Sequence, residues 1–199
     1  MVDKYGVDQD PYTYNDSTIL INKFNIRDEA ILEEAEKEFT LIAAMDIEFQ
    51  SPPYDFQYLC NLHKKLFGDL FEWAGELRAI DISKGQTRFC NYRYIEKEAN
   101  LIFAKLAKEN YLLGLSFHLL IERLAEYYCD INALHPFREG NGRAQRLLFE
   151  HLVINCGYNM NFETIESNEW VDANIHGYHC DYSLMGEILK RCVIIPKRM

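Results

Sequence analysis

The stretch HPFREGNGRAQR, at positions 135–146, joins the end of one helical pattern to the start of the next. Gly140 and Gly142 let the backbone approach an anion closely, and their N–H groups can form a cradle around it. A helix that begins near residue 142 adds the positive end of its dipole at the same place. Arg143 and Arg146 are three residues apart and share one face of that helix, where both can contact phosphate oxygens. The stretch therefore predicts a site for a polyphosphate.

Two other side chains of this stretch can do chemistry. Glu139 offers hard carboxylate oxygens, the kind of ligand that holds Mg²⁺ together with phosphates. His135 is the one residue here that can exchange a proton near neutral pH. A histidine at a helix end is usually structural and arginines on a helix are usually solvated, but the adjoining Gly-Asn-Gly favours the functional interpretation. Arg138 is expected at the surface or in a salt bridge.

Composition narrows the class of protein. The chain has 199 residues, a net charge of −10 and 48% hydrophobic residues, as in a soluble globular domain. An acidic chain is a poor nucleic-acid binder, because such binders neutralise phosphates. No apolar run is long enough for a membrane span, and the N-terminus has no signal-peptide pattern, so a cytoplasmic location is expected. The six cysteines form no CxxC pair and predict reduced thiols.

Hydrophobic periodicity predicts an all-α fold with one small β-hairpin. A capping Asn25 starts the first helix, which runs to about residue 49, and Asp55 caps a second helix that ends at Gly68. A short helical turn ends at Gly75. The alternation after it, followed by Lys84-Gly85-Gln86, predicts the hairpin. The remaining helices are expected at 94–109, 117–133, from the GNG to Gly157, 167–176 and 182–192.

The stretch at 135–146 matches every fixed position of the Fic-domain signature His-Pro-Phe-x-Asp/Glu-Gly-Asn-Gly-Arg-x-x-Arg. The segments DPYTY, HKKLFGDLFEWAG, DISKGQTRF and IEKEA also resemble bacterial Fic proteins. The resemblance implies a single Fic domain over 1–199, with a helical bundle and a hairpin called the flap. Its parts are an N-terminal arm and helix (1–50), a core (55–160) with flap 80–92 and motif loop 135–146, and C-terminal helices (161–199).

This resemblance implies transfer of AMP from ATP to a hydroxyl side chain of a target protein. By position, His135 would deprotonate the hydroxyl and Glu139 would hold Mg²⁺. Asn141 and the amides of Gly140 and Gly142 would stabilise the α-phosphate. Arg143 and Arg146 would hold the β- and γ-phosphates.

The flap of the family binds an extended target segment by strand addition. The corresponding residues here are Ile82, Ser83, Thr87, Arg88 and Phe89, while Lys84 and Gly85 at the tip would lie over the nucleotide. Asp172, in a following helix, is expected at the adenine. The alternative is that the hairpin is an edge ribbon without a partner.

Regulation and targets are also inferred by resemblance. Self-inhibited Fic proteins carry a Ser/Thr-x-x-x-Glu-Gly/Asn helix whose glutamate engages the second arginine of the motif, here Arg146. The nearest match, Ser183–Glu187, is followed by Ile188 instead. We therefore expect inhibition by a separate small antitoxin with an inhibitory helix, as in compact Fic toxins, and a type II topoisomerase ATPase subunit as target. Two alternatives stay open: transfer of another nucleotide, and a non-catalytic module that binds nucleotide or antitoxin.

Overall fold

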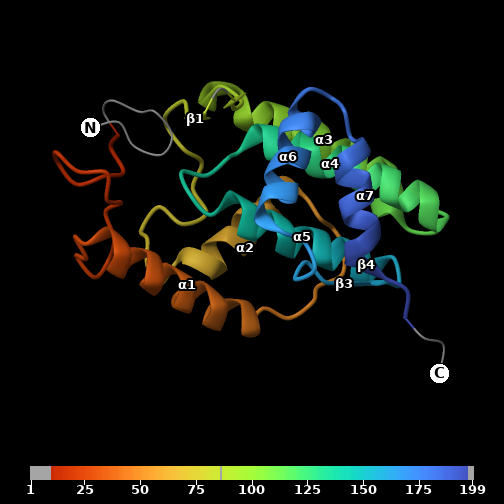
Figure 1. Ribbon diagram of the computed structural model, residues 1–199, viewed down its shortest axis with the longest axis horizontal. Coiled ribbons are helices and arrows are strands. Elements are labelled where there is room, and N and C mark those ends of the chain that lie inside the picture. The colour runs from red at the N-terminus through yellow and green to blue at the C-terminus, as the bar shows by residue number, and fades with distance from the viewer. Residues whose placement is uncertain (1–9, 86, 197–199) are drawn as a thin grey trace.

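The computed structural model describes residues 10–85 and 87–196. Over these ranges the fold is helical, as expected from the sequence, and it contains two small two-stranded pairs (Figure 1). In chain order the elements are α1 (Glu29–Met45), α2 (Phe56–Phe67), β1 (Ser83–Lys84), β2 (Thr87–Arg88), α3 (Ile95–Lys108), α4 (Phe117–Leu134), α5 (Asn141–Asn155), β3 (Asn159–Met160), α6 (Ser167–Tyr178), α7 (Ser183–Cys192) and β4 (Val193–Ile194). Single 3₁₀ turns occupy Tyr92–Tyr94 and Asn110–Leu112.

The start of α1 differs from the expectation. Asp28, not Asn25, caps the helix, because its extended backbone lets a carboxylate oxygen accept the Ile31 N–H at 3.0 Å. Asn25 has a φ of 54° and lies in the preceding turn. The helix ends at Met45, short of residue 49, where the N–H of Asp46 bonds back to the carbonyls of Ala43 and Ala44.

The second helix has the capping residues that the sequence predicts. Asp55 accepts the Tyr58 N–H at 2.7 Å, and α2 ends at Gly68. The segment that follows is a series of hydrogen-bonded turns rather than a helix, and it buries Phe71 and Trp73 against the core. These turns lead the chain into the flap.

Helix α4 is the centre of the bundle and packs against α3, α5, α6 and α7, while α2 packs against α1 and α5. In Figure 1, α1 runs along the lower edge of the molecule and α6 and α7 lie over α4. The apolar stripe that periodicity predicts on α4 is buried throughout: Leu120, Ile121, Leu124, Tyr128 and Ile131. All six cysteines are free thiols.

The hairpin is shorter than the segment 80–92 that the sequence predicts. Ser83 pairs with Arg88 and Lys84 with Thr87, and one further bond joins the Phe89 N–H to the Ile82 carbonyl at 3.3 Å. Beyond that point the second leg leaves the ribbon, because the Cys90 N–H bonds to Ala133 at the end of α4 at 3.0 Å. The flap is thus attached to α4 instead of extending as a free ribbon.

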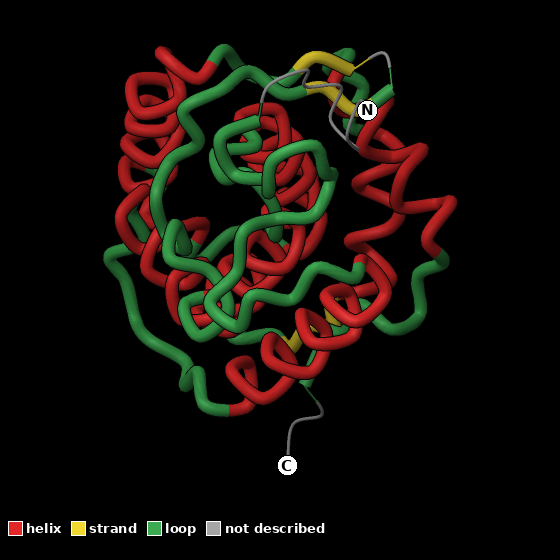
Figure 2. The backbone as a smooth tube through the Cα atoms, turned by 90° about the vertical axis from the view of Figure 1, so that its left-hand side faces the viewer, coloured by secondary structure: helices red, strands yellow, loops and turns green. Residues whose placement is uncertain are grey.

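A second strand pair was not expected. Asn159 pairs with Ile194 and Met160 with Val193, which joins the segment after α5 to the end of α7. Figures 1 and 2 place this pair and the flap at opposite ends of the molecule.

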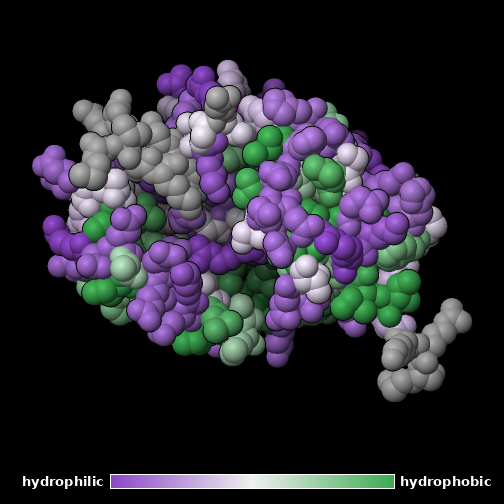
Figure 3. Space-filling view, in the orientation of Figure 1, coloured by the Kyte–Doolittle hydropathy of each residue, from purple (hydrophilic) through white to green (hydrophobic). Residues whose placement is uncertain are grey.

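The face shown in Figure 3 is mostly hydrophilic, with apolar side chains interrupting it along α1. The large exposed apolar side chains of α1 are Ile31, Leu41, Ile42 and Met45. None of the described helices combines the length and the apolar character that a bilayer span requires.

Candidate active site

His135 lies at the C-terminal end of α4 in a left-handed backbone conformation, with a φ of 45°. Its ring stacks on the ring of Phe89 in the flap at 3.8 Å, and its Nδ1 lies 3.3 Å from the Asn132 carbonyl oxygen. Burial lowers the pKa of His135 to about 3, so the ring is neutral near pH 7. A ring that donates Nδ1–H to Asn132 carries its lone pair on Nε2, which suits a general base.

The backbone of the motif loop depends on Gly140. This residue has a φ of 78°, and a Cβ there would stand 2.3 Å from the ring of Phe67. Helix α5 starts immediately afterwards, at Asn141, so the amides of Asn141 and Gly142 lie in its first turn. Such amides have no partner within their own helix and can bind an anion.

The Asn141 side chain, which is expected at the α-phosphate, is hydrogen-bonded within the motif loop. The side chain is buried, its Oδ1 accepts the Phe137 N–H at 2.8 Å, and its Nδ2 donates to the Phe137 carbonyl at 2.8 Å. The amide therefore closes the motif loop upon itself. In this structure the side chain braces the loop, and its contact with a phosphate stays a prediction.

The two arginines of the motif loop have different neighbours. The Arg143 guanidinium forms an ion pair with Glu36 of α1 and lies 4.6 Å from the centroid of the Phe67 ring. Arg146 is half-buried, and its Nη1 lies 3.8 Å from the place a Cβ on Gly142 would take. The Arg146 guanidinium thus folds back toward the first turn of α5, and Glu36 is a site neighbour that sequence reasoning did not find.

The side chain of His63 in α2 packs against the motif loop. Its ring stacks on Phe137 at 3.9 Å and on Phe67 at 4.6 Å, its Nδ1 accepts the Gly75 N–H, and its Nε2 lies 2.9 Å from the Glu139 carbonyl oxygen. Burial lowers the pKa of His63 to about 4. The helical sequence pattern around His63 carries no sign of this contact with a residue 76 positions away.

Arg138 is buried in an ion pair with Asp10 at 2.5 Å, which connects the motif loop to the DPYTY segment. This bears out a salt bridge for Arg138. The same segment reaches the turn before the flap, because the Tyr12 hydroxyl accepts the Ala79 N–H at 3.0 Å.

The flap residues separate into buried and outward-facing groups. Ile82 and Phe89 are buried, so their side chains pack inward, whereas Lys84, Gly85 and Arg88 are exposed and Ser83 and Thr87 are half-buried. The Arg88 carbonyl accepts the Tyr178 hydroxyl of α6 at 2.8 Å. Asp172 lies exposed on α6, and among the described residues no hydrogen bond or ion pair joins it to the motif loop.

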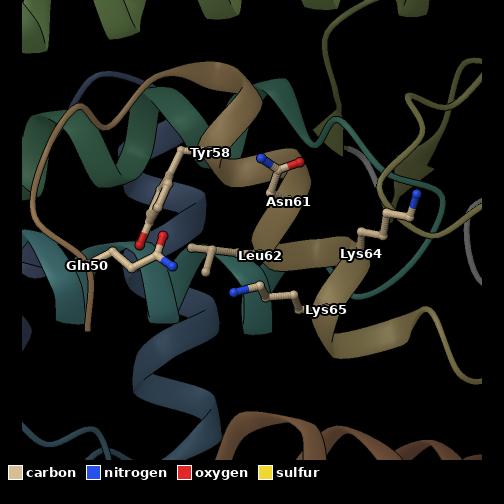
Figure 4. Close-up of a pocket in the computed structure, with 6 residues that line it drawn as sticks. All are labelled: Gln50, Tyr58, Asn61, Leu62, Lys64 and Lys65. Atoms are coloured by element: carbon tan, nitrogen blue, oxygen red, sulfur yellow. The ribbon is translucent and has the colours of Figure 1, made fainter. Parts of the chain in front are cut away.

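A pocket of about 330 Å³ lies on another part of the surface, along α2 and the segment before it (Figure 4). Gln50, Tyr58, Leu62 and Lys65 converge on it, while the amine of Lys64 points the other way. No residue of the motif loop lines this pocket. The chemistry-bearing groups are gathered at the loop and the flap instead.

The site thus combines a buried neutral histidine, a hairpin that stacks on it, and a glycine-bordered helix N-terminus that carries two arginines. These are the parts of a Fic-type domain. The chain belongs to the Fic/DOC family, whose model matches residues 53–153. Its relatives place it among the protein adenylyltransferases of that family.

Two relatives and one solved structure show how far the similarity extends. The chain is 43% identical to the "Probable protein adenylyltransferase Fic" of Escherichia coli (strain K12), over 97% of this chain and 96% of that protein. It is 37% identical to the protein adenylyltransferase VbhT of Bartonella schoenbuchensis, over 94% of this chain and 40% of that longer protein. The BepC protein of Bartonella tribocorum, solved with bound AMPPNP, superimposes with a TM-score of 0.85 at 28% identity, covering 94% of this chain and 97% of that one.

Proposed function

We propose that the chain transfers AMP from ATP to a hydroxyl side chain of a target protein held by the flap. The observation that carries this proposal is the position of His135, whose neutral ring stacks on Phe89 of the flap at the start of the motif loop that leads into α5. A base at that junction lies between a protein segment on one side and a phosphate on the other. A plain nucleotide-binding module would need no such base.

The reaction follows from these positions. Nε2 of His135 takes the proton of the target hydroxyl as its oxygen attacks the α-phosphorus of ATP. The new O–P bond forms while the bond from the α-phosphorus to the bridging oxygen breaks, and pyrophosphate leaves. First-turn amides of α5 stabilise the charge on the α-phosphate. Arg143 and Arg146 hold the β- and γ-phosphates and orient the α-phosphorus for in-line attack.

Magnesium fits this site as a shared ion. The described residues contain no group of three histidine, cysteine or acidic side chains that could hold a metal by themselves. Glu139 is the carboxylate of the motif loop, and Mg²⁺ commonly takes one protein carboxylate with phosphates and water as its other ligands. When bound, the ion would neutralise charge on the polyphosphate, with Glu139 as its protein ligand.

The flap supplies the target contact in this proposal. Its outward-facing residues, together with the backbone of Ser83 and Thr87, would pair with an extended target segment, and Lys84 and Gly85 would border the nucleotide. By family resemblance the target is a type II topoisomerase ATPase subunit. Asp172 is the proposed adenine contact because of its place in α6.

A separate antitoxin is the proposed inhibitor. Helix α1 leaves Ile31, Leu41, Ile42 and Met45 exposed, and the same helix reaches the motif loop through Glu36 and Arg143. This apolar face lies on the side of α1 opposite Glu36, so an inhibitory helix packed on it would act on the polyphosphate site through α1. The chain purified alone should therefore be active.

The decisive experiment compares the wild type with His135→Ala and with His118→Ala, a control at an exposed position of the same helix. With α-labelled ATP, we expect label on protein for the wild type and the control, and at least a 100-fold slower transfer for His135→Ala. ATP binding, measured by calorimetry, should survive in all three proteins. A purified gyrase ATPase subunit serves as the first target.

Two results would redirect the proposal. If none of the three proteins labels any protein while each binds ATP, the non-catalytic module is the correct interpretation. Labelling from α-labelled UTP, CTP or GTP in preference to ATP would show a Fic-type transfer of another nucleotide.

A further inference from the structure

Arg78 is an arginine whose side chain is fully buried beneath the flap, with no exposed area. Its Nε donates to the His135 carbonyl at 2.8 Å and its Nη2 to the Leu134 carbonyl at 3.1 Å, which are the last carbonyls of α4. Its Nη1 donates to the Ile80 carbonyl at 2.6 Å, and its Nη2 also donates to Cys90. One guanidinium thus joins the catalytic end of α4 to both legs of the flap.

The surroundings explain why a positive charge is stable there. Carbonyls at a helix C-terminus carry the negative end of the helix dipole and lack partners within their own helix. The guanidinium supplies donors to them in one fixed plane, and Asp81 lies 3.9 Å from its Nη1. Asp81 continues the connection, because it accepts from Asn91 at 2.6 Å, from the Tyr92 N–H at 2.9 Å and from Arg88 at 3.1 Å.

We infer that Arg78 is a positioning residue that sets the distance between a flap-bound target hydroxyl and His135. The inference rests on the proposed function, because it concerns the geometry of transfer to a protein. The segments that Arg78 joins are those whose relative position decides whether the hydroxyl reaches Nε2 and the α-phosphorus. The backbone adds two parallel connections, from the Arg78 N–H to Pro136 at 2.9 Å and from the Cys90 N–H to Ala133 at 3.0 Å.

The polyphosphate site, in contrast, is built on α5, α2 and α1, and in the part of the chain that the structure describes Arg78 bonds to its loop through the backbone at His135 and Pro136. Loosening Arg78 should therefore slow transfer to protein far more than it weakens nucleotide binding. A lysine at this position keeps the charge but has a single nitrogen and cannot bond the carbonyls of three segments in one plane. A misplacement of about 1 Å is enough to cost ~100-fold in rate.

The test uses the full chain with Arg78→Lys, and Arg123→Lys as a matched control. Arg123 lies on α4 and, like Arg78, bonds several groups, with its Nε donating to Glu109 at 2.9 Å, but its contacts lie far from the flap. Hydrogen exchange is measured first, because it needs no enzymatic activity. In Arg78→Lys we expect amides of 78–90 to exchange at least tenfold faster and those of α7 to keep their wild-type protection, whereas Arg123→Lys leaves the flap unchanged.

Transfer kinetics provide the second readout. In Arg78→Lys, label transferred to protein from α-labelled ATP should fall ~100-fold, mainly in kcat, while the calorimetric Kd for ATP changes less than twofold. Unchanged flap exchange in a folded Arg78→Lys, or an equal loss of transfer and ATP binding, would overturn the inference. If the wild type itself labels nothing, the proposed function fails, and hydrogen exchange alone decides the role of Arg78.

Should Arg78→Lys lose the protection of α7 and thus unfold globally, Asp81→Asn replaces it. That variant keeps Arg78 and weakens the acceptor at the base of the flap. We expect severalfold faster exchange at 78–90 and a matching loss of transfer with ATP binding intact, and wild-type flap exchange would again overturn the inference.

Discussion

At the scale of single residues, burial determines the protonation of the two histidines of the site. The ring of His63 stacks on Phe137 and the ring of His135 stacks on Phe89, and burial is the largest cause of the lowered pKa of each. Both rings are therefore neutral wherever the protein is folded near pH 7. For His135 this means a base ready to accept a proton, and for His63 it means a fixed donor and acceptor beneath the loop.

This neutrality makes stability depend on pH. In the unfolded chain His63 has a pKa near 6.5, whereas in the folded chain its pKa is about 4. The unfolded state therefore binds more protons between these two pH values. The contribution of neutral His63 to the free energy of unfolding is fully present above pH 6.5 and decreases as the pH falls below that value. From pH 8 to pH 5, His63 should remove about 2 kcal/mol from the free energy of unfolding.

The measurement is urea denaturation at both pH values for the wild type, His63→Gln and His118→Gln. His63→Gln should lose that part of the pH dependence, and the exposed His118 control should keep the wild-type behaviour. Identical pH dependence in all three proteins would contradict a buried neutral His63.

At the scale of elements, the junction between α4 and α5 has little tolerance for added atoms. The ring of Phe67 fills the space in front of Gly140, and the same ring contacts His63 and Arg143. A shift of the Phe67 ring would therefore disturb both His63, which packs under the motif loop, and Arg143 of the phosphate site.

Gly140→Ala should therefore destabilise the protein by about 3 kcal/mol, from the positive φ and the overpacking combined. Gly157→Ala is the matched control, with a similar φ of 85° and no atom within 4 Å of the added Cβ. It should lose about 1 kcal/mol, the conformational part alone. Thermal unfolding of both variants measures the difference, and equal losses would show that Phe67 yields without cost.

At the scale of the whole molecule, the N-terminal arm and the motif loop form one unit. Asp10 and Arg138 are 128 residues apart, and their buried ion pair places the arm against the loop. Through Tyr12 the arm also contacts the approach to the flap.

Asp10→Ala should lower the free energy of unfolding by about 3 kcal/mol, because it removes the carboxylate that neutralises a buried guanidinium. The double variant Asp10→Leu with Arg138→Met should recover most of that loss, since neither charge then needs compensation. Urea denaturation of both proteins is the measurement. A double variant as unstable as Asp10→Ala would argue against the ion pair as the cause.

Local signals in the sequence were sufficient for most of the elements. Asp55 and Gly68 delimit α2 as predicted, and the stripe on α4 is buried, because capping and periodicity act over a few neighbouring residues. Asn25 shows the limit of such signals. Asn25 and Asp28 are both good capping residues, and Asp28 caps α1 because its backbone is extended while that of Asn25 is left-handed. The hairpin is shorter than predicted because the Cys90 N–H bonds to the Ala133 carbonyl of α4 and not to the first leg of the hairpin.

The sequence by itself determined the family, the order of the helices and the motif loop, because these depend on residues that are neighbours along the chain. Only the tertiary structure decided which groups surround that loop. Glu36, His63, Arg78 and Asp10 reach it from distant segments, and Asn141 and Phe89 turn their side chains inward. Contacts of this kind arise when whole helices pack, so no spacing in the sequence could reveal them.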